Sequence, residues 1–208
     1  MNYAQQKRIL DVLIALVLIV LFLPVWIVVP LLIYFDSGRP IIFKHQRVGK
    51  AGKIFWLLKF RSMVIDADEI LYKKDNDLLA KFKRGDWKVE AKEDPRITKI
   101  GRIIRSLTID EFPQLVNVLR GEMSIVGPRA YIREELDEQT QKYPETHKFV
   151  EDILSIKPGI TGPWQTSGRN AVPFEQRAAM DANYARKKDI LEDFRILLKT
   201  PMAMLSKW

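Results

Sequence analysis

The sequence predicts an α+β protein that is mostly helical, with an N-terminal membrane helix followed by a compact domain that contains a small β-hairpin. Two observations lead to this prediction. Residues 12–35 carry no charged side chain, and the rest of the chain alternates short apolar runs with charged, helix-forming segments. We therefore divide the 208 residues into a membrane anchor, residues 1–36, and a second domain, residues 37–208.

Composition narrows the class of protein and the class of site. Hydrophobic residues make up 47% and charged residues 29%, which is enough apolar material for a core. The absence of Cys excludes a disulfide scaffold and a thiolate zinc site. Two His residues argue against a transition-metal centre, whereas carboxylates remain available for a hard cation. The net charge of +8 favours anionic partners, namely nucleic acid, acidic lipid or phosphorylated substrates.

The apolar run predicts insertion into a membrane. Residues 12–35 would form a helix of about 36 Å, against a bilayer core of about 30 Å. The run is too long for the apolar part of a signal peptide. A buried helix of a soluble domain is the alternative, but such helices usually keep a polar stripe. Pro24 lacks an N–H group, so a kink is expected near the middle of the run.

Basic residues flank the apolar run on both sides. Lys7 and Arg8 precede it, and Arg39, Lys44 and Arg47 follow it. Basic flanks prefer the cytoplasmic side of a membrane. The charges therefore favour a re-entrant hairpin with both ends in the cytoplasm, whereas the length favours a kinked span. Both interpretations stay open on these grounds.

The second domain begins with the predicted hairpin. Residues 41–48 and 54–60 have the composition of strands, and a glycine-containing turn separates them. Helices are predicted at residues 65–84, 99–106, a stretch ending near Gly121, 131–142, 174–187 and 190–205. Residues 86–97 and 158–168 are expected to be loops. The last helix is amphipathic, so it fits either core packing or the membrane interface.

Two adjacent carboxylates, Asp110 and Glu111, lie at a predicted helix start. Thr108 and Glu111 have the spacing of a capping box, while Pro113 suits the first turn and moves the N-cap towards Asp110. The helix dipole and the nearby Arg105 should keep Asp110 ionised. Capping is the commoner role for such a pair. The alternatives are nucleophilic attack on phosphorus and binding of Mg²⁺.

Basic residues supply a possible phosphate site. Lys59 and Arg61 are expected on one face at the end of the second strand. Arg129 follows Gly-Pro in a predicted loop, and Arg169 lies between Gly and Asn in another. Guanidinium groups suit phosphate oxygens. Together with Arg105 these residues suggest a diphosphate site, although each also fits a solvated surface charge.

Several ordered motifs carry a family resemblance. They are FKHQRVG at residues 43–49, KFRSM at 59–63, RSLTIDEFPQL at 105–115, NVLRGEMSIVGPR at 117–129, PGITG at 158–162 and QTSGRN at 165–170. In this combination the chain resembles the bacterial sugar transferases, which are monotopic phosphoglycosyl transferases. The resemblance extends from the apolar run to the last helix.

The resemblance implies an enzyme that transfers a sugar-1-phosphate from a UDP-sugar to polyprenyl phosphate, usually undecaprenyl phosphate, at the first membrane step of exopolysaccharide, O-antigen or glycoprotein glycan assembly. It implies that Asp110 is the nucleophile and a Mg²⁺ ligand, that a covalent phosphosugar forms with release of UMP, and that Glu111 supports this step. The implied binding residues are Lys59, Arg61, Arg105 and Arg129 for phosphate and Arg169 for nucleotide or sugar.

The resemblance also implies a re-entrant anchor in the bacterial inner membrane, with the catalytic domain, residues 37–208, on the cytoplasmic face. Leu23 stands where many members have Ser, and Ala130 stands where many have Pro. Larger members carry an N-terminal multi-span region, and we expect this chain to correspond to the minimal catalytic unit.

A membrane-tethered nucleic-acid-binding or scaffold protein is the alternative function. Nucleic-acid binding would favour interleaved aromatic and basic residues, and Phe60 between Lys59 and Arg61 is the one good instance. We therefore expect no nucleic-acid partner. The sequence leaves open which sugar is transferred and whether the chain forms a homo-oligomer.

Overall fold

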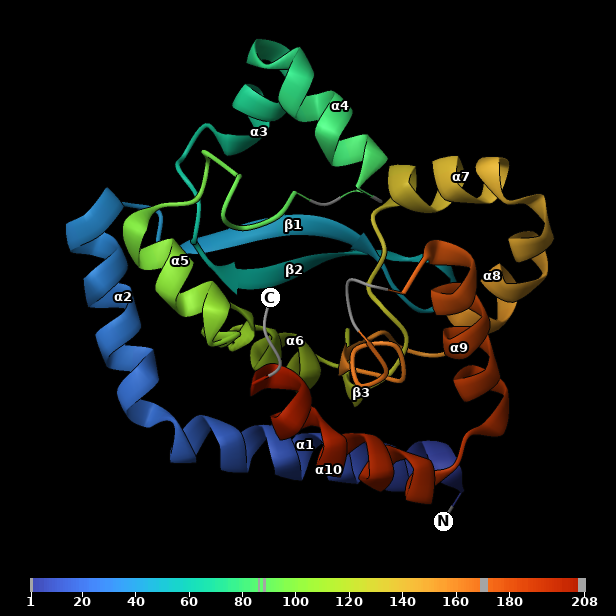
Figure 1. The fold of residues 1–208 in the computed structure, drawn as a ribbon. Helices are drawn as coiled ribbons and strands as arrows, with labels where there is room; N and C mark the ends of the chain where they lie inside the picture. Colours follow the sequence, from blue (N-terminus) through green and yellow to red (C-terminus); the bar gives the residue numbers. More distant parts are fainter. Residues whose placement is uncertain (1, 86, 88, 169–171, 206–208) are drawn as a thin grey trace.

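The structure, a computed structural model, describes residues 2–85, 87, 89–168 and 172–205 (Figure 1). Most of these residues are helical. The α-helices are α1 Tyr3–Leu21, α2 Leu23–Ser37, α3 Ala67–Glu69, α4 Asn76–Arg84, α5 Lys99–Ser106, α6 Gln114–Arg120, α7 Arg133–Lys142, α8 His147–Leu154, α9 Phe174–Lys187 and α10 Ile190–Leu205. Short 3₁₀ turns are η1 Lys50–Gly52, η3 Ile109–Glu111 and η4 Pro144–Thr146, and η2 Ile70–Lys74 is a π turn.

Strands form two small sheets. They are β1 Ile42–Val48, β2 Ile54–Phe60, β3 Ser124–Val126 and β4 Gly159–Thr161. β1 and β2 form the antiparallel hairpin, with Phe43 opposite Lys59 and Arg47 opposite Phe55. The mostly helical α+β class and the hairpin are therefore confirmed.

The second sheet was not predicted. β3 and β4 pair in parallel, although residues 158–168 were expected to be an irregular loop. The pairing depends on close backbone approach, because a Cβ at Gly159 would lie 2.1 Å from the backbone nitrogen of Gly127. Strands this short and rich in glycine show no alternation that a sequence pattern can detect.

The apolar run forms two helices rather than one. α1 ends at Leu21, α2 begins at Leu23, and the pair is bent by 64°. Pro24 lies in the first turn of α2, where its missing N–H costs no helical hydrogen bond. The kink expected near Pro24 is confirmed. By length and hydropathy no single helix among the described residues qualifies as a membrane span, whereas α1 and α2 qualify when taken together.

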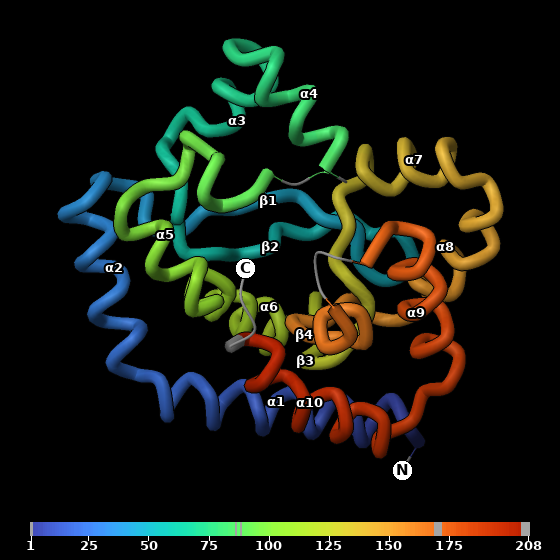
Figure 2. Tube along the Cα trace, in the orientation of Figure 1, coloured from blue at the N-terminus to red at the C-terminus, as the bar shows by residue number. Residues whose placement is uncertain are grey.

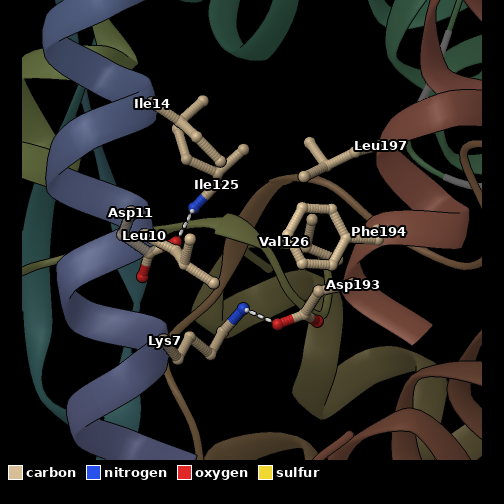
Figure 3. Close-up of a pocket in the computed structure, with 9 residues that line it drawn as sticks. All are labelled: Lys7, Leu10, Asp11, Ile14, Ile125, Val126, Asp193, Phe194 and Leu197. Carbon is tan, nitrogen blue, oxygen red and sulfur yellow. Dashed lines mark hydrogen bonds and ion pairs between the residues drawn. The ribbon is translucent and has the colours of Figure 1, made fainter. Parts of the chain in front are cut away.

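The N-terminal half of α1 is bound to the rest of the molecule by polar contacts (Figure 3). The ammonium group of Lys7 lies 2.8 Å from the carboxylate of Asp193 on α10. Asp11 is buried, and its carboxylate accepts hydrogen bonds from the hydroxyl of Ser124 and the backbone N–H of Ile125, both at 2.9 Å. These contacts fix α1 against β3 and α10.

Arg8 makes a third attachment. Its guanidinium donates to the carbonyl oxygens of Val118 at 2.6 Å and Leu119 at 2.8 Å, near the end of α6. Arg8 thereby supplies donors at the C-terminus of α6, where the Val118 carbonyl also accepts the N–H of Gly121 at 2.9 Å. Lys7 and Arg8, the basic residues that precede the apolar run, are thus both engaged within the protein.

Three apolar clusters hold the elements together. The first joins α1 to the hairpin, α6, β3, α9 and α10, and the second lies among α7, α8 and α9. The third joins α2 to β2 and α5, through residues such as Ile33, Phe60 and Ile104. α1 and α10 run together along the base of the molecule, with the hairpin above them (Figure 2). The turn between α5 and α6 is thereby held next to β2.

One helix prediction needs correction. Residues 65–84 do not form one helix, because Asp75 is extended at φ −134° and its carboxylate accepts the N–H of Leu78 at 2.8 Å, which starts α4. The bounds of α10 agree with the predicted last helix, and its packing against the first cluster confirms the core-packing alternative for one face. Ile196 is buried in the first cluster, whereas Leu198 and Met202 stay exposed on the other side.

Candidate active site

Asp110 and Glu111 lie in η3, the short turn between α5 and α6. Thr108 enters this turn in the left-handed region, at φ 58° and ψ 18°, which is unfavourable for a β-branched residue. α6 begins at Gln114 with Pro113 at its N-cap, and no described side chain caps it. The capping roles considered for Thr108 and Asp110 are therefore wrong. The carboxylates of Asp110 and Glu111, the carboxylate pair, are left free for other contacts.

β2 places a cation against the carboxylate pair. The Lys59 ammonium lies 2.6 Å from Oε1 of Glu111 and 4.0 Å from Oδ2 of Asp110. The side chains of Lys59 and Glu111 are 27% and 29% exposed, whereas that of Asp110 is 9% exposed. The Asp110 carboxylate is therefore recessed behind an ion pair that reaches solvent.

The two carboxyl groups differ in acidity. Burial raises the pKa of Asp110 to about 6; Lys59 lowers this pKa, the charge of Glu111 raises it, and Arg105 lowers it. Burial also acts to raise the pKa of Glu111, but the Lys59 ammonium outweighs it and holds that pKa below its usual value. The sequence favoured a low pKa for Asp110 on the grounds of the helix dipole and Arg105, but burial outweighs the nearby cations and raises it. A carboxyl group with a pKa raised towards neutrality is typical of functional sites.

Arg129 is held in place from several directions. Its backbone N–H donates to the carboxylate of Asp181 at 3.0 Å, and its guanidinium lies 5.5 Å from the centre of the Trp164 ring. Its Nε lies 3.5 Å from Oε1 of Glu135. The charge of Arg129 also lowers the pKa of Glu111, so Arg129 belongs to the same electrostatic environment as the carboxylate pair.

Arg61 does not lie beside the carboxylate pair. Its side chain is buried, and Nη2 donates to the carbonyl oxygens of Ser37 at 2.6 Å and Gly38 at 2.9 Å, at the end of α2. The shared strand face expected for Lys59 and Arg61 is not found, because β2 ends at Phe60. The structure thus brings Lys59, and not Arg61, to the carboxylate pair. Arg169 lies outside the described residues.

Two residues of β1 belong to this region although the sequence analysis did not select them for the site. Arg47 and His45 lie on the strand face that carries Lys59. Nη2 of Arg47 lies 3.1 Å from Nδ1 of His45, whose pKa burial lowers to about 3, so the neutral ring accepts this hydrogen bond. The predicted hairpin contained the signal for this shared face. Phe43 pairs with Lys59, and alternate residues of a strand share a face, so Arg47, four residues after Phe43, points to the same side as Lys59.

The arrangement suits attack on phosphorus. A recessed carboxylate lies 4.0 Å from the Lys59 ammonium and within the electrostatic influence of Arg105, and both cations could bind phosphate oxygens. No group of three or more His, Cys, Asp or Glu residues gathers within the described ranges. Asp110 and Glu111 alone still fit Mg²⁺, which usually takes one or two carboxylates together with water and substrate phosphates. The clefts beside Lys7 and beside Lys83 lie away from the carboxylate pair.

Comparison with known proteins supplies independent information. A sequence model of the family described as bacterial sugar transferase matches residues 2–207. The exopolysaccharide production protein ExoY of Sinorhizobium fredii is 39% identical over 204 residues, which cover 97% of this chain and 86% of that protein.

Two further relatives carry more specific names. The undecaprenyl-phosphate galactose phosphotransferase of Salmonella typhimurium is 39% identical over 97% of this chain, which spans 40% of that longer protein. The UDP-glucose:undecaprenyl-phosphate glucose-1-phosphate transferase of Caulobacter vibrioides is 34% identical, over 97% of this chain and 70% of its own length.

Proposed function

Because the chain belongs to the bacterial sugar transferase family, we propose that it transfers a sugar-1-phosphate from a UDP-sugar to a polyprenyl phosphate, with undecaprenyl phosphate as the expected acceptor. The names of the Salmonella and Caulobacter relatives describe this chemistry for those proteins. Those names differ in the sugar, galactose or glucose, so the donor sugar stays open. Family membership favours this enzyme over a membrane-tethered nucleic-acid-binding or scaffold protein.

One observation carries the proposed mechanism: the recessed Asp110 carboxylate, 4.0 Å from the Lys59 ammonium and next to Glu111. In the first step an oxygen of Asp110 attacks the β-phosphorus of the UDP-sugar. The bond between that phosphorus and the oxygen bridging to the α-phosphate breaks, and the bridging oxygen leaves with UMP. The sugar phosphate is then joined to Asp110 through an acyl phosphate bond.

In the second step a phosphate oxygen of the polyprenyl phosphate attacks the same phosphorus. The bond to Asp110 breaks, the carboxylate is regenerated, and the product is a polyprenyl diphosphate sugar. The two substrates therefore use one carboxylate in turn, which suits a site with one set of cations around one recessed nucleophile.

The surrounding residues would stabilise the charge of the reacting phosphates. Lys59, Arg105 and Arg129 all act electrostatically on the carboxylate pair, which supports the proposal that they bind phosphate oxygens of the donor or acceptor. Asp110, supported by Glu111, would bind Mg²⁺, which supplies positive charge for the same oxygens.

We further propose that α1 and α2 enter the inner membrane as a re-entrant hairpin, with the catalytic domain on the cytoplasmic face. The 64° bend between the helices supports this arrangement. Lys7 ties the start of α1 to α10, and Arg61 ties the end of α2 to the chain after β2. Because the same domain holds both ends of the helix pair, a hairpin that returns to the same side of the membrane is favoured over a helix pair that crosses it.

The direct test is an assay of UMP release with a panel of UDP-sugars, polyprenyl phosphate vesicles and Mg²⁺. We expect at least one UDP-hexose to give UMP together with a lipid-linked sugar phosphate, and the same donor without acceptor to give at most one equivalent of UMP. Release of UDP in place of UMP, with the sugar transferred alone, would show a different reaction class and overturn the proposal.

A further inference from the structure

Glu135 is a completely buried carboxylate in the first turn of α7. Burial of a carboxylate is costly unless cations compensate for it. Two guanidinium groups lie within ion-pair distance of it here. Nε of Arg129 lies 3.5 Å from Oε1 of Glu135, and Nη1 of Arg47 lies 4.0 Å from Oε2. Each oxygen of this carboxylate therefore faces one arginine.

The two arginines, here called the arginine pair, come from different elements. Arg47 lies on β1, and Arg129 lies in the loop after β3. Nη1 of Arg47 donates to the carbonyl oxygen of Ala130 at 3.1 Å, which brings the strand to the loop that carries Arg129. Glu135, from a third element, lies beside both, so it is placed to set the distance between them.

The charges explain why a third group is needed. The charge of Arg129 lowers the pKa of Arg47, which means that the two cations repel each other. Glu135 offsets this repulsion by raising the pKa of each. The arginine pair also lowers the pKa of Glu111 in the carboxylate pair. The arginine pair thus connects a buried anion to the site of the proposed reaction.

We propose that Glu135 is a positioning residue that holds Arg47 and Arg129 together as a two-guanidinium site for the diphosphate of the sugar donor. This inference rests on the proposed function. Glu135 acts through the arginine pair and touches no substrate. Two guanidinium groups offer paired donors to adjacent phosphate groups. Without the carboxylate they would separate, and donor binding would weaken.

The test compares three variants. Glu135→Gln removes the charge at nearly constant volume, and Glu135→Asp keeps it. Glu138→Gln is the matched control, because Glu138 lies on the same helix and forms an exposed ion pair with Lys83 at 2.9 Å. We expect Glu135→Gln to raise KM for the UDP-sugar roughly 10- to 100-fold, as for loss of a supporting partner, with a smaller change in kcat. Glu135→Asp should recover much of the loss, and Glu138→Gln should match the wild type.

A binding measurement separates this inference from the proposed function. Calorimetric titration with UDP should show weaker binding by Glu135→Gln and unchanged binding by Glu138→Gln, whether or not transfer occurs. Loss of transfer in the wild type and in Glu138→Gln would instead overturn the proposed function. UDP affinity and KM in Glu135→Gln equal to those of the control would overturn the role of Glu135.

A double variant tests the inference even if Glu135→Gln alone does not fold. Glu135→Gln leaves two buried cations without their anion, whereas Arg129→Gln with Glu135→Gln removes one of them. If Glu135 acts through Arg129, the double variant should fold and bind UDP as weakly as Arg129→Gln alone. A further loss of UDP affinity in the double variant, beyond that of Arg129→Gln, would contradict the inference.

Discussion

Lys59 distinguishes the two neighbouring carboxylates of the site. Its ammonium lies 2.6 Å from Glu111 but 4.0 Å from Asp110, so Glu111 receives most of the stabilisation. Asp110 is also the more deeply buried side chain of the two. The Lys59 ammonium therefore holds the pKa of Glu111 below its usual value, whereas burial raises the pKa of Asp110 to about 6. This difference suits the nucleophilic role proposed for Asp110, because no fixed partner among the described residues neutralises its carboxylate fully.

This contrast predicts the pH dependence of the first step. Asp110 must be ionised to attack, so UMP release should fall as pH drops through about 6. Lys59 lowers the pKa of Asp110, so Lys59→Gln should raise that pKa and move the acid limb to higher pH. Lys44→Gln, an exposed position on β1, is the control. Single-turnover UMP release measured against pH gives the acid limb of the wild type and of each variant. An acid limb at the same pH in Lys59→Gln as in the wild type would contradict the assignment of this limb to Asp110.

Single residues of the site were predicted unevenly from the sequence. The motifs selected Asp110, Glu111 and Lys59, which the fold brings together. Arg61 was selected with Lys59, but the strand ends between them, so its side chain turns to α2. Glu135 gave no signal, because an acidic residue in a polar helix is usually exposed. Its burial depends on tertiary packing that no local pattern contains.

α5 packs unusually close to the chain that follows β2. A Cβ at Gly101 would lie 2.0 Å from the carbonyl oxygen of Ser62, so the contact requires glycine. This contact matters for the site because α5 leads directly into η3, which carries the carboxylate pair.

We therefore predict that Gly101→Ala destabilises the protein. Replacing glycine by alanine within a helix normally stabilises it by about 1 kcal/mol. Here the backbone clash should outweigh that gain and lower the free energy of unfolding by roughly 1–3 kcal/mol. Ser106→Ala, at an exposed position of the same helix, controls for helix propensity. Thermal unfolding of both variants in detergent is the measurement. An unchanged or higher Tm for Gly101→Ala would show that the contact is not as close as described.

Elements with clear periodicity were predicted well and those that depend on pairing were not. The hairpin and α5 follow from alternation and helical spacing. β3 and β4 are short and distant in sequence, so only the folded chain brings them together. The break at Asp75 arises because a side-chain cap starts a new helix within a continuous polar pattern.

In the whole molecule the apolar helices are part of one body with the domain. α1 crosses the base of the molecule and α2 rises beside α5, with both outer ends attached by polar contacts (Figure 1). Exposed apolar residues such as Val20, Leu23 and Ile27 lie around the bend between the helices. The bend is thus the part best suited to enter lipid, and the ends are best suited to stay with the domain.

This organisation predicts that both ends of the helix pair face the cytoplasm. The native chain has no Cys, so single Cys residues can be placed at Ala4 and Arg39, which are both exposed. Both should resist a membrane-impermeant thiol reagent in intact cells and react once the membrane is opened. Labelling of the Ala4 position from outside, with Arg39 protected, would show that the pair spans the membrane and would overturn the re-entrant arrangement.

The central claim is that Asp110 carries the sugar phosphate between two substrates. The most direct measurement is mass spectrometry of the purified protein after incubation with the UDP-sugar and Mg²⁺ alone, followed by rapid quenching. We predict one added sugar phosphate on the peptide that contains Asp110, an equal amount of UMP, and loss of the adduct when polyprenyl phosphate is added. Asp110→Asn should form none. Full turnover by Asp110→Asn, or UMP release that always requires the acceptor and leaves no adduct, would contradict the claim.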